Sequence, residues 1–405
     1  MKIKEVSACE ILDSRKEKTI FVSIKTNVGS FSASSPNGKS TGKFESKPYK
    51  KSLDEDIKKI KELSDYFSEE EFTCFDCLEK IEYVVKGYLG ANTTFALESA
   101  VLKAIAKEKK KEVWQLINPE SKKFPRLVGN VIGGGKHSQT TPLGVHPGGA
   151  RPQSIELGGK KPDFQEFLLI PKTKKVKEAF ELNKKAKEEA ERILKKLDDD
   201  FKSKKTDENA WMTSLNEKLV LDILYKLKGE FNMEIGVDLA ASGFYKRKKY
   251  HYLNPKLDRG EEEQLEYLSN LIKNYNLFYI EDPFNEENFE SFSKLLKKFP
   301  DKLIVGDDLA VTNSKRLEKA IEKKSINAII VKPNQCGSLL EVKKVCELAK
   351  KHKIKIVFSH RSGETEENIL ADLAFGFEAD FFKCGIDGNE RISKINRLIE
   401  IERNI

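Results

Sequence analysis

The sequence predicts an α/β fold, in which a small α+β domain over residues 1–125 precedes a β/α barrel over residues 126–405. Strand-like segments come first and amphipathic helical patterns follow them, which is the order expected of an α+β unit. From about residue 233, short apolar runs alternate with helical patterns, and this rhythm indicates parallel βαβ units. Six such runs in series favour a closed barrel over an open sheet.

The first 35 residues read as three short strands of an antiparallel sheet, with Gly29 at a turn. The residues that alternate in the second of these strands are Ile20, Val22 and Ile24. A polar, glycine-bearing loop follows at Pro36–Gly42. Helical patterns then cover residues 52–67, with Ser52 as the cap, and residues 93–117.

Composition excludes several classes of protein. The net charge of +8, from 73 basic and 65 acidic residues, is too mild and too evenly spread to indicate specific nucleic-acid binding. No run of eighteen apolar residues occurs and the N-terminus lacks a signal-peptide pattern, so we expect a cytoplasmic protein with no membrane partner. Six cysteines in 405 residues do not form a disulfide framework. Cys74 and Cys77 form a single CxxC, for which core packing is favoured over metal or redox chemistry.

Residues 138–163 have five glycines, four prolines and no apolar periodicity, which predicts a long loop. Loops of this length are usually lids, binding loops or disordered insertions. A long amphipathic helix follows over residues 176–197.

The six apolar runs of the predicted barrel each end in a polar or charged residue, and the spacing between these residues is 23 to 43 positions. They are Asp238, Glu281, Asp307, Lys332, His360 and Lys383. Because the carboxyl ends of barrel strands converge on one face, we expect these side chains to meet in one cavity.

Three carboxylates in one cavity require a compensating cation. A set of oxygen ligands without cysteine or histidine favours Mg²⁺, with Mn²⁺ as a substitute, over zinc. The alternative is that each acid caps a helix or pairs with a lysine. Lys332 and Lys383 either neutralise the carboxylates or act in proton transfer, because a nearby cation lowers the pKa of a lysine. This arrangement suits removal of a proton next to a carboxylate.

Several segments, in the same order from end to end, resemble the enolases (phosphopyruvate hydratases). The most specific are IEDPF at Ile280–Phe284 and SHRSGETEEN at Ser359–Asn368. The others are DSR (Asp13–Arg15), PNGKSTG (Pro36–Gly42), GAN (Gly90–Asn92), GNVIGGGKH (Gly129–His137), FQEF (Phe164–Phe167), DE (Asp207–Glu208), IGVDLAAS (Ile235–Ser242), GDDLAVTN (Gly306–Asn313) and VKPNQCGSLLE (Val331–Glu341). The resemblance implies an enolase-type barrel with an N-terminal capping domain.

The resemblance also implies roles for individual residues. Two Mg²⁺ ions would bind in each active site, the first to Asp238, Glu281 and Asp307, and the second with the help of Ser40. Lys332 would remove the C2 proton of 2-phosphoglycerate. Glu208, assisted by Glu166, would protonate the departing C3 hydroxyl to give phosphoenolpyruvate. The residues implied in substrate binding or in lining the pocket are Gln165, Arg361, Ser362, Lys383, His137 and His360. A homodimer or a dimer-based assembly is implied as well.

The sequence departs from the family pattern at a few positions. Lys39 replaces a small residue near the expected phosphate site, Asn209 replaces a glycine, and Gly243 stands where glutamate is common. His137 and Glu166 are 29 positions apart, about 20 more than the family pattern, so the active-site loop is enlarged. The enlargement would alter loop closure, substrate choice or a subunit contact, or is a plain surface insertion.

Three functions follow as hypotheses. The first is a magnesium-dependent enolase of glycolysis and gluconeogenesis. The second is a paralogue that acts on another α-carboxylate substrate, against which the phosphate-binding Arg361 and Ser362 argue. The third is a binding protein without turnover, which the presence of both Lys332 and Glu208 disfavours.

Overall fold

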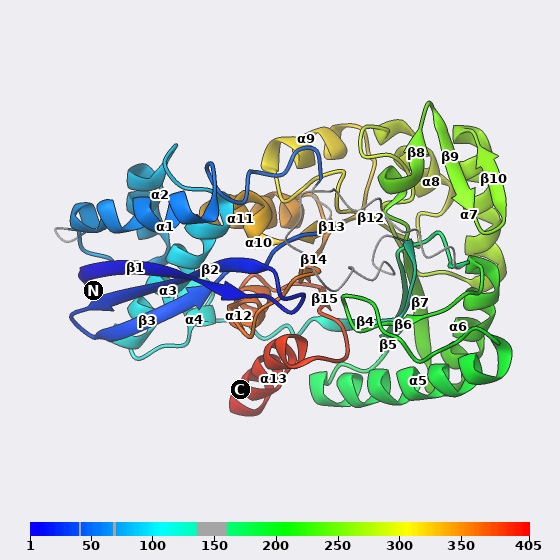
Figure 1. Cartoon of the computed structure of the whole chain (residues 1–405), viewed down its shortest axis with the longest axis horizontal. Helices are drawn as coiled ribbons and strands as arrows, with labels where there is room; N and C mark the ends of the chain where they lie inside the picture. Colours follow the sequence, from blue (N-terminus) through cyan, green and yellow to red (C-terminus); the bar gives the residue numbers. More distant parts are fainter. Residues whose placement is uncertain (40–41, 68–69, 136–159) are drawn as a thin grey trace, which may run out of the picture.

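A three-stranded antiparallel sheet opens the chain, as predicted (Figure 1). The computed structural model describes residues 1–39, 42–67, 70–135 and 160–405. The predicted pocket residues Ser40 and His137, and nearly all of the predicted loop at 138–163, lie outside the described residues. The sheet consists of β1 (Ile3–Leu12), β2 (Lys18–Thr26) and β3 (Gly29–Ser34), with β2 in the centre.

Helices cover this sheet. The predicted cap is present, since Ser52 Oγ accepts a hydrogen bond from the Glu55 N–H at the start of α1 (Leu53–Glu62). The helical pattern at 93–117 is two helices and not one: α3 (Ala91–Glu108) and α4 (Val113–Ile117). Three consecutive lysines, Lys109–Lys111, offer no apolar face at the break, and Lys110 takes a positive φ of 53°. The remaining segments are η1 (Ser64–Phe67), η2 (Phe75–Cys77) and α2 (Leu78–Val85).

Within the described residues, eight strands close into a barrel, in the order β4-β5-β7-β11-β12-β13-β14-β15, with β15 pairing back to β4. Their bounds are β4 (Arg126–Gly133), β5 (Glu166–Pro171), β7 (Met233–Asp238), β11 (Tyr279–Glu281), β12 (Leu303–Gly306), β13 (Ala328–Val331), β14 (Lys355–Ser359) and β15 (Phe381–Lys383). The short β6 (Trp211–Met212) pairs with β4. The predicted closed barrel is therefore confirmed.

One strand departs from the expected parallel pattern. β5 runs antiparallel to both β4 and β7, whereas the pairs from β7 through β15 and back to β4 are parallel. No described helix lies between β4 and β5, and a parallel return needs a crossover connection. The reversal puts Glu166, the first residue of β5, opposite Asp238, the last residue of β7.

The barrel helices lie outside the strands in Figure 1. They are α5 (Val176–Leu197), α6 (Glu217–Phe231), α7 (Glu261–Tyr275), α8 (Phe289–Lys298), α9 (Ser314–Glu322), α10 (Pro333–Cys336), α11 (Leu339–Lys351), α12 (Ile369–Gly376) and α13 (Asn389–Asn404). The predicted amphipathic helix at 176–197 coincides with α5. After β7 come η4 (Ala241–Phe244) and a small sheet that sequence patterns did not predict, formed by β8 (Tyr245–Lys246), β9 (Lys249–Leu253) and β10 (Lys256–Arg259). No helix among the described residues has the length and apolar character needed to span a membrane.

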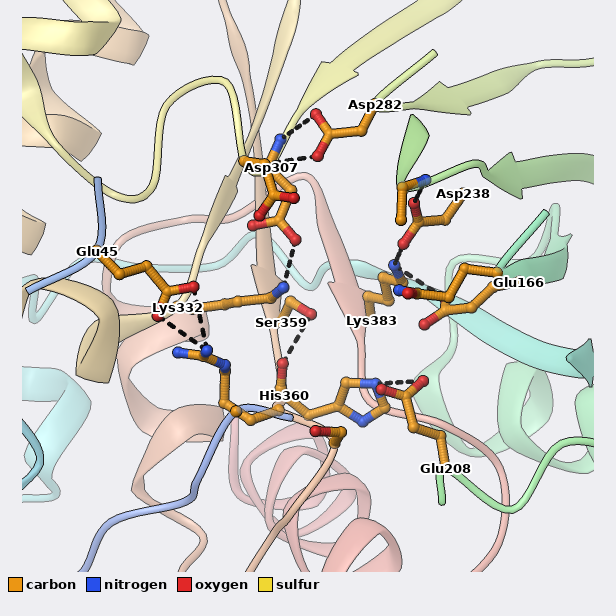
Figure 2. A pocket seen from close by; sticks show the side chains of 16 residues that line it. Glu45, Glu166, Glu208, Asp238, Asp282, Asp307, Lys332, Ser359, His360 and Lys383 are labelled. Atoms are coloured by element: carbon orange, nitrogen blue, oxygen red, sulfur yellow. Dashed lines mark hydrogen bonds and ion pairs between the residues drawn. The ribbon is translucent and has the colours of Figure 1, made fainter. Parts of the chain in front are cut away.

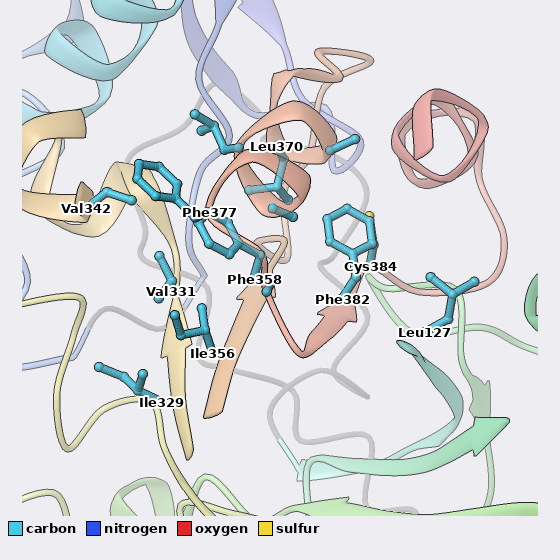
Figure 3. Packing of buried hydrophobic residues seen from close by; sticks show 14 of the residues in the cluster. Leu127, Ile329, Val331, Val342, Ile356, Phe358, Leu370, Phe377, Phe382 and Cys384 are labelled. Atoms are coloured by element: carbon cyan, nitrogen blue, oxygen red, sulfur yellow. The ribbon is translucent and has the colours of Figure 1, made fainter. Parts of the chain in front are cut away.

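The core has two layers because strand side chains alternate between the two faces of the barrel wall. Ile330 and Val357 belong to a small apolar cluster inside the barrel. Their neighbours Val331 and Phe358 point outward, towards Val342 of α11 and Leu370 of α12 (Figure 3). Continuous apolar runs in the sequence therefore follow from burial of both faces.

The CxxC segment differs from its sequence-based interpretation. Phe75 is buried, but Cys74 is exposed and Cys77 is only half-buried. Core packing is therefore wrong for Cys74 and holds in part for Cys77, which is half-buried against the apolar core.

Candidate active site

The strand-end residues predicted from the sequence meet in one pocket at the carboxyl ends of the barrel strands (Figure 2). Asp238, Asp307, Lys332, His360 and Lys383 line it, whereas Glu281 does not line the pocket but accepts a hydrogen bond from Lys383. Gln165, Glu166, Glu208, Arg361 and Ser362 also line the pocket. Its empty volume is about 490 Å³. The described part of the predicted site is thus assembled from residues up to 218 positions apart, as between Gln165 and Lys383.

Lys383 lies among three buried carboxylates. Its Nζ is 2.8 Å from Glu281 Oε2, 3.0 Å from Asp238 Oδ2 and 2.9 Å from Glu166 Oε2. Burial lowers the pKa of Lys383, but these carboxylates outweigh it and raise the pKa well above its usual value. Burial, with the charge of Asp238, raises the pKa of Glu281 to about 8. Lys383 is thus surrounded by more carboxyl groups than one ammonium group compensates, and the raised pKa of Glu281 is the consequence.

Lys332 follows β13 and pairs with Asp307, which follows β12. Burial lowers the pKa of Lys332, but the charge of Asp307 more than offsets it, so that the pKa is raised. The other oxygen of Asp307 accepts a hydrogen bond from Gln335 Nε2 at 3.2 Å. The Lys332 N–H donates to Thr312 Oγ1 at 2.9 Å. Both partners are therefore held in fixed positions by neighbouring polar groups.

Asp238, Glu281 and Asp307 fit a hard divalent cation by their chemistry. They supply only carboxylate oxygens, they are at most 7% exposed, and Glu281 is the direct strand partner of Asp238. Among the described residues, however, the three acids whose carboxylate oxygens all lie within 4.8 Å of one another are Asp282, Asp307 and Asp308, and not this predicted set. The Asp282 carboxylate accepts the N–H groups of Asp307 at 3.0 Å and Asp308 at 2.7 Å, so it orients the backbone beside Asp307.

Glu166, Glu208 and His360 form a compact group on the other side of the pocket, with one ligand atom of each within 4.8 Å of the others. Burial, and then the charge of Glu208, raise the pKa of Glu166 well above its usual value. Two buried carboxylates at this distance favour a shared proton. His360 Nε2 is 3.4 Å from Glu208 Oε2.

Arg391, in α13, orients His360. Its Nη1 is 2.7 Å from His360 Nδ1, and because a guanidinium only donates, the neutral imidazole carries its proton on Nε2, facing Glu208. Burial and the charge of Arg391 lower the pKa of His360 to about 4. Arg391 is fully buried and also donates to the Arg361 carbonyl at 2.5 Å and the Ser362 carbonyl at 2.8 Å.

The guanidinium of Arg361 pairs with Glu45, with Nη2 2.9 Å from Glu45 Oε2, and Nη1 donates to Asn334 Oδ1 at 3.2 Å. Glu364 is near Arg361 in the sequence, but it accepts the Arg361 backbone N–H and pairs with Lys394. The planar guanidinium of Arg361 thus binds a pair of anionic oxygens beside the pocket, which here belong to the Glu45 carboxylate.

Comparison with known proteins identifies the family. The model described as "Enolase, C-terminal TIM barrel domain" matches residues 155–405, and "Enolase, N-terminal domain" matches residues 3–117. The chain belongs to the enolase family. A curated enolase of Methanosphaera stadtmanae is 34% identical over 100% of this chain and 97% of its own length. One from Saccharolobus islandicus is 35% identical over 99% of this chain and 95% of its own length. One from Pyrobaculum aerophilum is 38% identical, over 69% of this chain and 64% of its own length.

Membership of the enolase family confirms the predicted class of enzyme, a carbon–oxygen lyase of the phosphopyruvate hydratase type. It also confirms the predicted architecture of a barrel with an N-terminal domain. The individual residue roles, the metal count and the domain boundary near residue 125 stay predictions.

Two departures from the enolase pattern have a structural explanation. Asn209, in place of a glycine, has a positive φ of 62°, which asparagine adopts more readily than most residues. Its Nδ2 donates to the Asp387 carbonyl at 3.2 Å and to Glu390 Oε1 at 3.1 Å. Lys39 Nζ is 2.6 Å from Asp207 Oδ2, so Lys39 forms an ion pair with the residue that precedes Glu208. Nothing in the structure explains Gly243.

Sequence patterns missed Arg391, Glu45 and Asp282. Arg391 and Glu45 are in a helix and a loop whose local patterns look like ordinary surface charge. Of the three, only Asp282 could have been found from the sequence, because it lies inside the IEDPF segment.

The folded enolase is expected to lose stability in acid partly through His360. Its folded pKa of about 4 is below the unfolded value of about 6.5, so its contribution is complete above pH 6.5 and is lost as the pH falls through 4. The difference corresponds to up to about 3 kcal/mol of unfolding free energy.

Urea unfolding of wild type and His360→Gln at pH 7 and pH 4 measures this contribution of His360. The variant should lose less stability than wild type between the two pH values, whereas the exposed control His352→Gln should match wild type. Equal losses in wild type and His360→Gln would contradict the assignment.

Proposed function

We propose that this protein is a magnesium-dependent enolase that dehydrates 2-phospho-D-glycerate to phosphoenolpyruvate. The observation that carries the proposal is the position of Lys332 and of the Glu166–Glu208 pair on different sides of one pocket (Figure 2). A 1,2-elimination needs a base at one carbon and an acid at the next. The enolase names of the curated relatives support the same reaction.

Proton removal is assigned to Lys332 and protonation of the leaving hydroxyl to Glu208. Burial and the charge of Glu208 raise the pKa of Glu166 well above its usual value, so Glu166 is assigned to assist Glu208 by sharing a proton with it. Asn130 Nδ2 donates to Glu208 Oε2 at 3.2 Å and holds this carboxylate beside His360, whose Nε2 is 3.4 Å away. When bound, a divalent cation held by Asp238, Glu281 and Asp307 would polarise the substrate carboxylate and offset the Asp307 charge that raises the pKa of Lys332.

Substrate binding is assigned to Arg361 and Ser362 at the phosphate and to Lys383 and Gln165 at the carboxylate. In this arrangement the phosphate would take the position of the Glu45 carboxylate at the Arg361 guanidinium. Ser362 Oγ accepts the Lys39 N–H at 2.8 Å, which joins the N-terminal loop to this end of the pocket. A second magnesium ion at Ser40, a pocket role for His137 and a dimeric assembly are part of the proposal on family grounds alone.

Phosphoenolpyruvate formation from 2-phosphoglycerate, followed by ultraviolet absorbance with and without Mg²⁺, tests the proposal. We expect turnover that requires the metal. Turnover of glycerate or another unphosphorylated hydroxy acid in preference would support the paralogue instead. A thermal shift with phosphoenolpyruvate but no turnover by the magnesium-loaded protein would overturn the proposal in favour of a binding protein.

The Lys39–Asp207 ion pair is expected to assist catalysis through Glu208. Lys39→Ala removes a partly buried contact between the N-terminal loop and the segment that carries Glu208. We expect kcat/KM to fall about fivefold, the equivalent of about 1 kcal/mol for such a pair. Lys43→Ala is the matched control, because Lys43 pairs with Glu287 at 2.9 Å on the exposed surface and does not line the pocket. Steady-state kinetics that are equal for the two variants would contradict the role of Lys39.

A further inference from the structure

A pair of thiols lies on the surface of the N-terminal domain and has no part in the proposed reaction. The Sγ atoms of Cys74 and Cys77 are 2.9 Å apart. The Cys77 N–H donates to the Cys74 carbonyl at 3.3 Å, which closes a turn around the two residues between them. Cys74 is exposed and Cys77 half-buried, so small reagents have access to both.

The turn is fixed on the molecule by the two residues inside the CxxC. The Phe75 side chain is buried and packs edge-on against Phe377, after α12, with ring centroids 5.9 Å apart. Asp76 pairs with Lys343 of α11 at 2.6 Å. Because one residue is held in the core and the next on the barrel surface, the two thiols are kept together without needing each other as partners.

The two thiols differ in reactivity. Cys77 is the cap of α2, where the helix dipole favours a thiolate, and Cys74 precedes the turn. Burial raises the pKa of Cys77, but hydrogen bonds from Cys74 and Thr73 outweigh it and lower the pKa to about 7. The hydrogen bond to Cys77 raises the pKa of Cys74. Cys77 is therefore the nucleophilic thiol at neutral pH, and Cys74 is the protonated thiol that can resolve a mixed disulfide.

Two alternatives fit less well. Zinc takes four ligands in structural sites, and no group of three or more potential metal ligands among the described residues includes this pair. The buried Cys346 and Cys384 have pKa values raised by burial, which is the pattern of inert core thiols. Cys74 and Cys77 thus have neither the additional ligands of a zinc site nor the full burial of inert core thiols.

We propose that Cys74 and Cys77 form a reversible dithiol–disulfide couple that exchanges with low-molecular-weight disulfides. The Cys77 thiolate attacks a disulfide RSSR, forming a mixed disulfide and releasing RS⁻. The Cys74 thiol loses its proton and attacks the Cys77 sulfur, which closes the Cys74–Cys77 bond and releases the second RS⁻. In total the protein dithiol is oxidised by two electrons, and one RSSR is reduced to two RSH.

The full-length protein tests this couple with oxidised glutathione at pH 7, followed by intact mass and peptide mapping. We expect the wild type to lose two hydrogens, located in the peptide that contains residues 74–77, and to regain them with excess reduced glutathione. Cys74→Ser should stop at one glutathione on Cys77, because the resolving thiol is absent. Cys77→Ser should react about tenfold more slowly at Cys74, because an ordinary thiol is only a few per cent ionised at pH 7.

The exposed Cys9 provides the matched control. Cys9→Ser should form the internal disulfide as the wild type does. A wild type that keeps glutathione on Cys74 or Cys77 without closing the internal bond would overturn the proposal. So would failure of the pair to react under conditions in which Cys9 is modified. None of these readouts involves turnover, so they stand apart from the proposed function.

Discussion

Lys332→Met is expected to lower kcat by about 10²- to 10⁴-fold, the usual contribution of a positioned general base. Methionine keeps the length and the apolar stem of the side chain and removes the group assigned to take the C2 proton. Asp307 retains its contacts with Gln335 Nε2 and with the neighbouring backbone, so the strand end should keep its conformation. Steady-state kinetics at saturating Mg²⁺, with circular dichroism and a thermal melt to establish folding, measure the effect.

The control for Lys332→Met is Lys350→Met, since Lys350 is a partly exposed lysine of the same barrel that pairs with Glu378 at 2.9 Å. Its kinetics should equal those of the wild type. If Lys332→Met remains folded and retains more than about a tenth of wild-type kcat, another group removes the proton and the assignment fails.

Lys383→Met is expected to lower the unfolding free energy by about 3–5 kcal/mol in the absence of metal, the usual cost of removing one partner from a buried ion pair. The reason is that Glu166, Asp238 and Glu281 lose the only ammonium group that contacts all three in the described structure. Lys350→Met, whose ion pair is on the surface, should cost less than about 1 kcal/mol. Urea unfolding in a chelating buffer measures both variants.

Excess Mg²⁺ should restore part of the stability of Lys383→Met. A ligand that binds only the folded state adds about 2.7 kcal/mol at a concentration 100 times its Kd. Recovery would support the assignment of Asp238, Glu281 and Asp307 as metal ligands, because the added cation replaces the missing charge. A variant that Mg²⁺ does not stabilise would contradict that assignment, whatever its activity.

The strand-end residues were predictable because a barrel imposes a simple rule on them. Asp238, Glu281 and Lys383 each come last in their strands, and Asp307 and Lys332 follow theirs by one position. Apolar runs in the sequence reveal where strands end, and parallel strands bring those ends together. The rule missed β5 in one respect. Its antiparallel direction depends on how the chain returns after β4, and apolar periodicity contains no information on strand direction.

The charge partners of the site were not predictable in the same way. The sequence left open whether Asp238, Glu281 and Asp307 share a metal or pair with lysines. In the structure Asp307 pairs with Lys332, and Lys383 contacts Asp238, Glu281 and Glu166. Which acid meets which lysine depends on side-chain length and on the stagger of neighbouring strands. These are properties of the assembled barrel.

By itself, the sequence determined the N-terminal sheet, the barrel and the identity of the residues at its carboxyl face, because alternation and helical periodicity are local patterns with spacings of two to four residues. Tertiary structure alone decided that Glu45 meets Arg361 across 316 positions, that Arg391 sets the tautomer of His360, and that Cys74 is exposed while Phe75 is buried. The physical reason is that a charge or a thiol acquires its pKa and its partner from the groups packed around it, and most of those groups are distant in the chain.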